Sequence, residues 1–208
     1  MKTFLQTILF IAILSIPFFA SAQRRHSDKD TVGVFENMKG IVSNMFNNVE
    51  LTEERVSFMN DKKKWDSERQ KNIKWMVVGD RVFFCLPLNQ RGTDLQLMEV
   101  IALSKNKMLV QYWNLDYFYL IFDMQGNMVM EKRKVFNART IGSKHNNEKV
   151  FDEMQAQFGT CPELFDPMKY NLSDKQQLAT DIHAVRCEGA PELESVIKTL
   201  NAKYWIKD

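Results

Sequence analysis

The sequence has few of the residues, and none of the short motifs, on which hydrolytic enzymes are usually built. Its 208 residues include only three histidines, His26, His145 and His183, and no Gly-x-Ser-x-Gly segment. Nucleophilic hydrolysis needs a nucleophile, a base and an orienting acid, usually with a local signature around the nucleophile. None of the three histidines is flanked by such a signature, so we predict no catalytic residues.

The charge of the chain is also balanced, with 28 lysine and arginine residues against 26 aspartate and glutamate residues. This balance creates no long-range field that would attract nucleic acid or an anionic membrane. Carboxylates are plentiful, but no pattern places two of them opposite each other, as carboxylate-pair glycosidases require. A secreted hydrolase whose active site is assembled from scattered carboxylates stays open as an alternative function.

Long apolar runs are confined to the N-terminus. Ile8 to Phe19 is an apolar stretch of about a dozen residues, shorter than the roughly 20 residues of a membrane-spanning helix. Lys2 precedes it, and Ala20-Ser21-Ala22 follows it with the small-x-small pattern of a cleavage site. We predict a signal peptide over residues 1–22, cleaved between Ala22 and Gln23.

The predicted signal peptide sets the expected location of the protein. No cysteine follows the apolar stretch at the cleavage site, so a bacterial lipid anchor is not available, and no later segment resembles a membrane span. We expect an exported bacterial protein, periplasmic or secreted, with neither a membrane span nor a lipid anchor after cleavage.

Three cysteines remain after the signal peptide, and export favours a disulfide between two of them. Cys85 lies in the apolar run Val82-Phe83-Phe84-Cys85-Leu86, which is typical of a buried strand, where a thiol behaves as a small hydrophobe. We therefore expect Cys161 and Cys187 to pair. A bridge over that separation is worth about 3–4 kcal/mol in the chain-entropy model.

Cys161 and Cys187 could bind a metal ion as free thiolates, but they could not do so as a disulfide. His183 and Cys187 stand four residues apart, so on a helix both would point at one ion, with Cys161 as a third ligand. Oxidation of the cysteines to each other removes that site. Asp166 and Asp174 are too isolated to indicate calcium, so we predict neither a metal nor a cofactor.

After the signal peptide, residues 23–33 form a polar leader that we expect to be disordered. Residues 34–208 suit a single α+β domain, β-rich over 50–137 and helical over 144–205. Helical spacing of apolar residues predicts a short amphipathic helix over 34–46, with a strand over Gly40–Met45 as the alternative.

From Arg55 to Phe136, short apolar runs alternate with turn signals, a pattern typical of an antiparallel β-meander. We expect the meander to curl into a partial barrel or sandwich. The most apolar strand should lie centrally, covered on both faces, and the last strand at an edge. The predicted strands are Arg55–Asn60, Ile73–Val78, Arg81–Leu86, Leu95–Leu103, Lys107–Trp113, Tyr117–Asp123 and Met128–Phe136.

Helical spacing returns after Gly142, with Gly159 as a C-terminal cap and Pro162 in the first turn of a second helix. Ser173 and Gln176 form a capping box that predicts a third helix, and residues 192–208 could form one more. The Cys161–Cys187 bridge would then close a C-terminal helical hairpin.

This C-terminal region resembles one found in small uncharacterised exported proteins of Bacteroides-type bacteria. The matching residues are Phe158, Cys161-Pro162-Glu163-Leu164, Ser173-Asp174 and Cys187. The family usually has Tyr-Asn before its second cysteine, where this chain has Val185-Arg186. The resemblance covers about 45 residues, and it implies a β-rich module with a disulfide-tied helical end and no established activity.

Several aromatic residues gather around one predicted hairpin and are the best candidates for ligand contacts. Exposed aromatics on a sheet can stack on sugar rings or grip a peptide, although in so apolar a meander they also suit the core. The candidates are Tyr112, Trp113, Tyr117 and Tyr119. We expect an exported, non-enzymatic binding or interaction module, whose partner is an envelope protein or a glycan.

Overall fold

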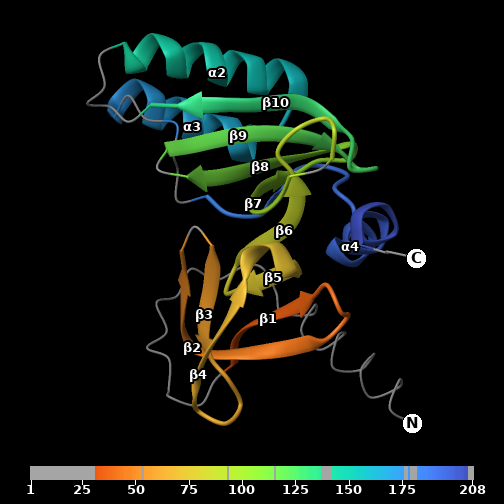
Figure 1. Ribbon diagram of the computed structural model, residues 1–208. Coiled ribbons are helices and arrows are strands. Elements are labelled where there is room, and N and C mark those ends of the chain that lie inside the picture. Colours follow the sequence, from red (N-terminus) through yellow and green to blue (C-terminus); the bar gives the residue numbers. More distant parts are fainter. Residues whose placement is uncertain are drawn as a thin grey trace.

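The computed structural model describes residues 31–52, 54–92, 94–114, 116–136, 142–175, 178 and 182–205. The predicted signal peptide, its cleavage site between Ala22 and Gln23, and positions 23–30 of the predicted leader lie outside these residues. The chain folds into an antiparallel meander that curls into a half-barrel and packs against helices (Figure 1). The predicted α+β fold class is confirmed.

Within the described residues, eleven strands form one sheet in the order β10-β9-β8-β7-β6-β5-β1-β2-β3-β4, with β11 paired to β7. All neighbours are antiparallel except β11, which runs parallel to β7. The strands are β1 (Thr31–Asn37), β2 (Val42–Leu51), β3 (Arg55–Met59), β4 (Trp65–Arg69), β5 (Ile73–Val78), β6 (Arg81–Pro87), β7 (Leu95–Leu103), β8 (Lys107–Asn114), β9 (Asp116–Asp123), β10 (Met128–Val135) and β11 (Val185–Arg186).

The seven strands predicted between residues 55 and 136 are all present, each within one residue of its predicted ends. The turns between these strands are stabilised by the glycine, aspartate and asparagine residues that predicted them. Gly79 takes a φ of 60° in the β5–β6 turn, a conformation that glycine adopts without strain. In the β9–β10 turn, the Asp123 carboxylate accepts hydrogen bonds from the backbone N–H groups of Gln125 and Asn127.

The helix predicted over residues 34–46 is wrong, because this segment forms the β1–β2 hairpin. Its turn is held by the side-chain oxygen of Asn37, which accepts hydrogen bonds from the N–H groups of Lys39 and Ile41 at 2.9 and 3.0 Å. Gly40 completes the turn with a φ of 75°. The β-rich region therefore begins at Thr31, within the predicted leader, rather than at residue 50.

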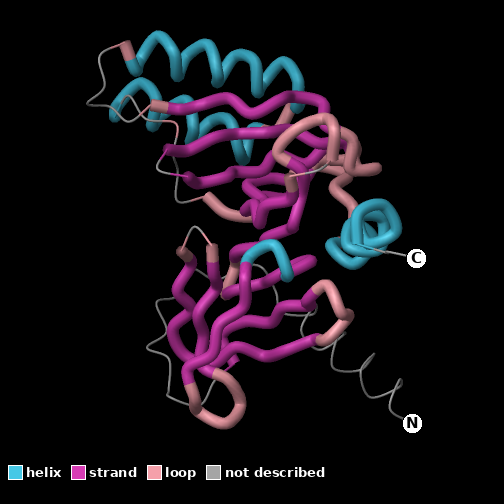
Figure 2. The backbone as a smooth tube through the Cα atoms, in the orientation of Figure 1, coloured by secondary structure: helices cyan, strands magenta, loops and turns pink. Residues whose placement is uncertain are grey.

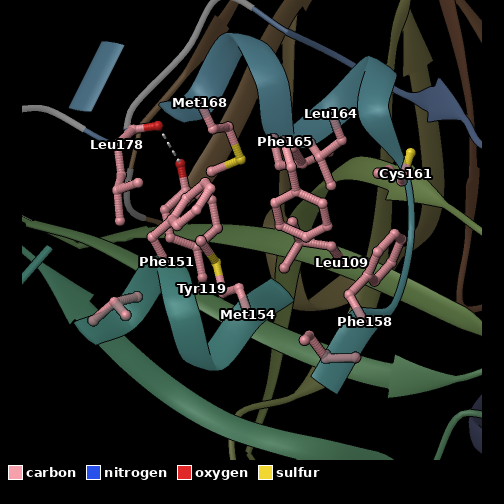
Figure 3. Packing of buried hydrophobic residues seen from close by; sticks show 14 of the residues in the cluster. Leu109, Tyr119, Phe151, Met154, Phe158, Cys161, Leu164, Phe165, Met168 and Leu178 are labelled. Atoms are coloured by element: carbon pink, nitrogen blue, oxygen red, sulfur yellow. Dashed lines mark hydrogen bonds between the residues drawn. The ribbon is translucent and has the colours of Figure 1, made fainter. Parts of the chain in front are cut away.

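Three α-helices are present in the described residues, and two of them cover one face of the sheet (Figure 2). They are α2 (Ser143–Phe158), α3 (Pro162–Lys175) and α4 (Leu193–Leu200); α4 continues into a π-helical turn, Asn201–Trp205, and a 3-10 turn, Gln70–Asn72, precedes β5. Helices α2 and α3 pack together over β8, β9 and β10 through apolar side chains, among them Phe151, Phe158 and Phe165 (Figure 3).

The two helices that form the hairpin are not the two that were predicted to form it. Ser173 lies inside α3 and does not begin a new helix, since its hydroxyl donates hydrogen bonds to the carbonyls of Lys169 and Tyr170. Val185 and Arg186, which come after the predicted start of that third helix, form strand β11 instead. The partner of α3 in the helical hairpin is therefore α2. The predicted tail helix is present as α4.

The most apolar of the predicted strands, β9, is covered on both faces as predicted, but it lies second from the edge of the sheet and not centrally. In β9, Tyr119 and Ile121 are buried in the core beneath α2 and α3. Leu120 and Phe122 are buried in a second core on the opposite face, which α4 covers. The predicted edge position of β10 is also confirmed, since it is the last strand of the sheet.

The C-terminal turn connects parts of the sheet that are far apart. Trp205 is buried, its ring lies 6.2 Å from that of Phe84, and its indole N–H donates to the carbonyl of Cys85 at 3.1 Å. One residue earlier, the Tyr204 hydroxyl donates to the carbonyl of Gly126 in the β9–β10 turn. The turn Asn201–Trp205 thus holds β6 and the β9–β10 turn to α4.

We expect Trp205→Ala to lower the free energy of unfolding by about 3–5 kcal/mol, because it removes a buried indole and leaves a cavity. Trp65→Ala is the matched control: Trp65 is 57 % exposed on the edge strand β4. Its removal should change the free energy by less than about 0.5 kcal/mol. Urea unfolding followed by circular dichroism measures both, and equal losses in the two variants would contradict the role given to Trp205.

Candidate functional site

The candidate site lies where β11 replaces β6 as the hydrogen-bonded neighbour of β7. The ladder between β6 and β7 ends at the pair Val82–Val100, but β7 continues to Leu103. Beyond that point the N–H of Ala184 donates to the carbonyl of Val100 at 3.0 Å, and the N–H of Cys187 donates to the carbonyl of Leu103 at 2.8 Å. The segment 184–187 therefore occupies the place in the sheet that β6 leaves open.

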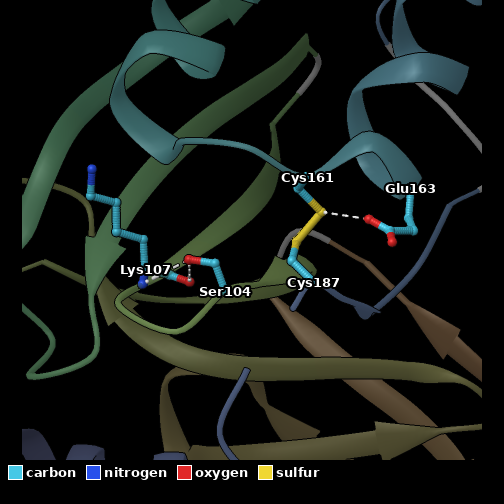
Figure 4. Close-up of a disulfide and its surroundings, with 5 residues drawn as sticks. All are labelled: Ser104, Lys107, Cys161, Glu163 and Cys187. Atoms are coloured by element: carbon cyan, nitrogen blue, oxygen red, sulfur yellow. Dashed lines mark hydrogen bonds between the residues drawn. A yellow bond between two sulfur atoms is a disulfide. The ribbon is translucent and has the colours of Figure 1, made fainter. Parts of the chain in front are cut away.

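The predicted disulfide Cys161–Cys187 is confirmed and fixes this segment (Figure 4). Its Cα atoms are 5.4 Å apart, and both cysteines are buried. It joins the start of α3 to the end of β11, so it ties a helix to the sheet and not one helix to another. Cys85 is a buried free cysteine in β6, and burial raises the pKa of its thiol to about 12.

A buried carboxylate gathers two basic side chains at this junction, and we call Arg81, Glu99 and His183 the charged seam. Glu99 of β7 accepts hydrogen bonds from Nε and Nη2 of Arg81, the first residue of β6, at 2.7 and 2.6 Å. Nδ1 of His183 lies 2.7 Å from Oε1 of Glu99, close enough for an ion pair but off the line of a well-aligned hydrogen bond. The seam thus joins β6, β7 and the segment leading into β11.

The side chains of the seam differ in burial, and this difference bears on the pKa values of Glu99 and Arg81. The Glu99 side chain is 6 % exposed, whereas that of Arg81 is 40 % exposed. Burial acts to raise the pKa of Glu99, but the hydrogen bonds from Arg81 and the close contact with His183 outweigh it and leave the pKa below its ordinary value. Glu99 therefore stays ionised at neutral pH, and its hydrogen bond raises the pKa of Arg81.

The strand geometry divides the four predicted aromatic candidates between the two faces of the sheet. Trp113 and Tyr117 lie directly opposite each other on β8 and β9 and are 47 % and 39 % exposed. Tyr119 is on the same face but fully buried, with its hydroxyl near the carbonyl of Leu178 (Figure 3). Tyr112 is half-buried on the other face, packed against the second core.

The exposed pair, Trp113 and Tyr117, belongs to the same face as the charged seam. Glu99 pairs across the sheet with Gln111, and Gln111 pairs with Tyr119, so these side chains point to one face. Tyr117 and Trp113 stand two residues further along their strands, on that same face. The hydrogen bond from Glu99 is the main cause of the raised pKa of Arg81, and the Tyr117 phenol is the smallest of its named causes. We call Trp113 and Tyr117 the aromatic pair.

Other candidates from the sequence are not brought together. His183 lies in an extended segment and not on a helix, and its former partners as zinc ligands are joined in the disulfide. His145 is exposed on α2, and His26 lies outside the described residues. No group of three or more His, Cys, Asp and Glu side chains that could hold a metal ion occurs in the part of the chain that the structure describes.

A small apolar pocket lies beside the seam, on the opposite face of the sheet. Its cavity volume is about 20 Å³, which is room for roughly one water molecule. It is lined by Val82, Val100, Leu103, Ala184, Arg186 and Leu193. A cavity of this size does not accommodate an organic substrate.

Sequence reasoning missed the charged seam, although one signal was present. Glu99 interrupts the apolar run Leu95–Leu103, and a charge inside a buried strand needs a partner. The partner residues carry no motif, so only the topology identifies them.

No family model, curated protein or solved structure matches this chain. Among the described residues, no helix is long and apolar enough to cross a membrane.

Removing either partner of the Arg81–Glu99 pair should destabilise the fold, but by unequal amounts. Arg81→Gln leaves a buried carboxylate with His183 alone, whereas Glu99→Gln leaves a guanidinium that reaches water. We expect losses of about 3 kcal/mol for R81Q and about 1–2 kcal/mol for E99Q in urea unfolding at neutral pH. A larger loss in E99Q than in R81Q would contradict the assigned burial.

The free energy of unfolding should depend on pH through the ionisation of the Glu99 carboxylate. Because the pKa of Glu99 is lower in the folded state than its ordinary value of 4.5, its contribution is present above that value and is lost as pH falls through the folded pKa. Wild-type protein should therefore lose more stability than E99Q between about pH 5 and pH 3. Urea unfolding at each pH measures the two slopes, and equal slopes would count against the depressed pKa.

Removing the disulfide should release His183 from the seam. The double variant Cys161→Ser/Cys187→Ser should lose about 3–4 kcal/mol of stability, because it opens a loop across 26 positions. The imidazole nitrogen shifts of His183 should move towards those of a free histidine in NMR spectra. His145, exposed on α2, is the internal control and should keep its shifts; unchanged shifts at His183 would show that β11 holds without the bridge.

Proposed function

We propose that the protein is an exported, non-enzymatic binding module whose ligand contacts the aromatic pair. The observation that carries the proposal is the contrast on β9: Tyr119 is fully buried, whereas Tyr117 and its cross-strand neighbour Trp113 present their rings to solvent. Large aromatic side chains bury much area on binding at a small cost in rotamer entropy. Candidate partners are an envelope protein or a glycan, as expected for a chain with a signal-peptide pattern and a disulfide.

The aromatic pair is distinguished from the other exposed aromatic residues by its surroundings. Trp65 lies on the edge strand β4 and Tyr170 on the outer side of α3, 57 % and 66 % exposed. Single exposed aromatics are ordinary on protein surfaces. Trp113 and Tyr117 are neighbours on adjacent strands and share their face with polar side chains of the seam, which is the usual composition of a binding surface.

The electrostatics of the seam support binding more than catalysis. A general acid needs a raised pKa, but Glu99 has a lowered one and is neutralised by Arg81. One observation favours the alternative of a secreted hydrolase: the contact between Glu99 and Nδ1 of His183 resembles the acid–base half of a catalytic triad. That alternative requires a nucleophile at Nε2, and the contacts described for His183 do not include one.

The proposal is tested by capture from an envelope extract with immobilised mature protein. Trp113→Ala should reduce the captured protein and carbohydrate about tenfold or more, since one buried aromatic anchor contributes more than 1.4 kcal/mol at many interfaces. Tyr117→Ala should act in the same direction, whereas Trp65→Ala, which removes an equally large exposed ring elsewhere, should leave capture unchanged. Equal capture by W113A and wild type would overturn the proposal, and hydrolysis of a model ester that depends on His183 would favour the alternative.

A further inference from the structure

We infer that the ligand of the aromatic pair is an uncharged sugar chain, stacked on Trp113 and Tyr117 and hydrogen-bonded by the charged seam. This inference rests on the proposed function and names the class of ligand. It follows from three properties of the surface: two adjacent exposed rings, polar groups held in place by a buried anchor, and charges that are already paired.

The two rings form a platform wide enough for a sugar ring. Residues directly opposite on antiparallel strands have Cβ atoms about 4.5–5.5 Å apart, so Trp113 and Tyr117 project from neighbouring positions on one face. One side of the platform has a fixed neighbour, because Val135, the partner of Tyr117 on β10 and on the same face, is buried in the core beneath α2 and α3. Sugars present C–H groups on the faces of their rings, and these groups pack on aromatic faces.

The seam supplies hydrogen-bonding groups on the same face as the platform, where Glu99 lies in the row of side chains next to that of the aromatic pair. Glu99 uses Nε and Nη2 of Arg81 and Nδ1 of His183, so Nη1 of Arg81 and Nε2 of His183 are not part of those contacts. The side chains of Arg81 and His183 are 40 % and 25 % exposed, within reach of a ligand. Because a buried carboxylate already holds both side chains, little conformational entropy is lost when they bind hydroxyl groups.

The charges around the platform are paired, which favours an uncharged ligand. Arg81 is neutralised by Glu99. On the opposite face of the sheet, Lys134 Nζ lies 2.5 Å from an Asp116 carboxylate oxygen. Arg133, opposite Tyr119, is bonded through two nitrogens to Glu153 of α2. The Arg81–Glu99 and Arg133–Glu153 pairs thus offer the platform no unpaired charge, which an acidic or basic ligand would require.

The sheet edges argue against a peptide that binds by strand addition. On β4, the N–H of Ser67 is bonded to the Asp66 carboxylate and the N–H of Arg69 to the Glu68 carboxylate. At the other edge, the side chain of Asn147 bonds both backbone groups of Phe136, and Asn146 donates to the carbonyl of Lys134. An incoming strand needs unpaired backbone groups along an edge, and these groups already have partners.

The experiment is binding of fluorescently labelled mature protein to an array of immobilised neutral oligosaccharides, acidic oligosaccharides and random-sequence decapeptides. We expect signals on neutral oligosaccharides only. Titration of the strongest one in solution, followed by tryptophan fluorescence, should give a dissociation constant that W113A raises about tenfold or more and that Tyr117→Ala also raises. Trp65→Ala should leave it within about twofold of the wild type. Both rings of the pair are exposed, so these variants should keep the wild-type melting temperature.

The outcomes separate this inference from the proposed function. Signals on acidic oligosaccharides or decapeptides that W113A abolishes would overturn the neutral-sugar assignment and leave a binding surface at the aromatic pair. A blank array would overturn the assignment as well, and the envelope capture experiment would then decide the proposed function alone. Sugar binding that W65A removes and W113A does not would overturn both.

Discussion

Strand β7 is longer than its neighbour β6, and the rest of the structure depends on how the remaining backbone of β7 finds its hydrogen bonds. The carbonyls of Val100 and Leu103 are at a buried position in the sheet, where unpaired backbone groups are costly. The two-residue strand β11 and its flanking residues satisfy them. So short a strand has little pairing of its own to hold it, which explains why the disulfide is attached at its end, at Cys187.

Because β11 lies in the plane of the sheet, the chain passes there from one face to the other. Before it, α3 packs in the core that contains Tyr119; after it, α4 packs in the core that contains Leu120. The short strand therefore separates two layers of helix that cover opposite faces. The turn Asn201–Trp205 completes the second layer by bonding to Cys85 and Gly126, so it depends on the same crossing.

The meander was predictable from sequence because its strands are apolar and its turns carry strong local signals. The β1–β2 hairpin was not, since Val34, Met38 and Val42 satisfy a helical spacing as well as a hairpin broken at Gly40. Strand β11 was beyond sequence reasoning for a different reason. Two residues carry no periodicity, and their pairing partner lies more than eighty positions earlier on β7.

The aromatic pair of the candidate site was predictable from the sequence, but the charged seam was not. Period-two alternation along β8 already separates Trp113 from Tyr112, so the division of the aromatics between two faces could have been derived. The meeting of Arg81 and His183 at Glu99 could not, because it depends on where β6 ends and β11 begins. The positions of the charged seam and of the aromatic pair nevertheless both depend on β7. The same strand that leaves room for β11 carries the buried carboxylate, and the next two strands, β8 and β9, carry the aromatic pair on that face. A ligand bound there would therefore contact side chains held by the most constrained part of the fold.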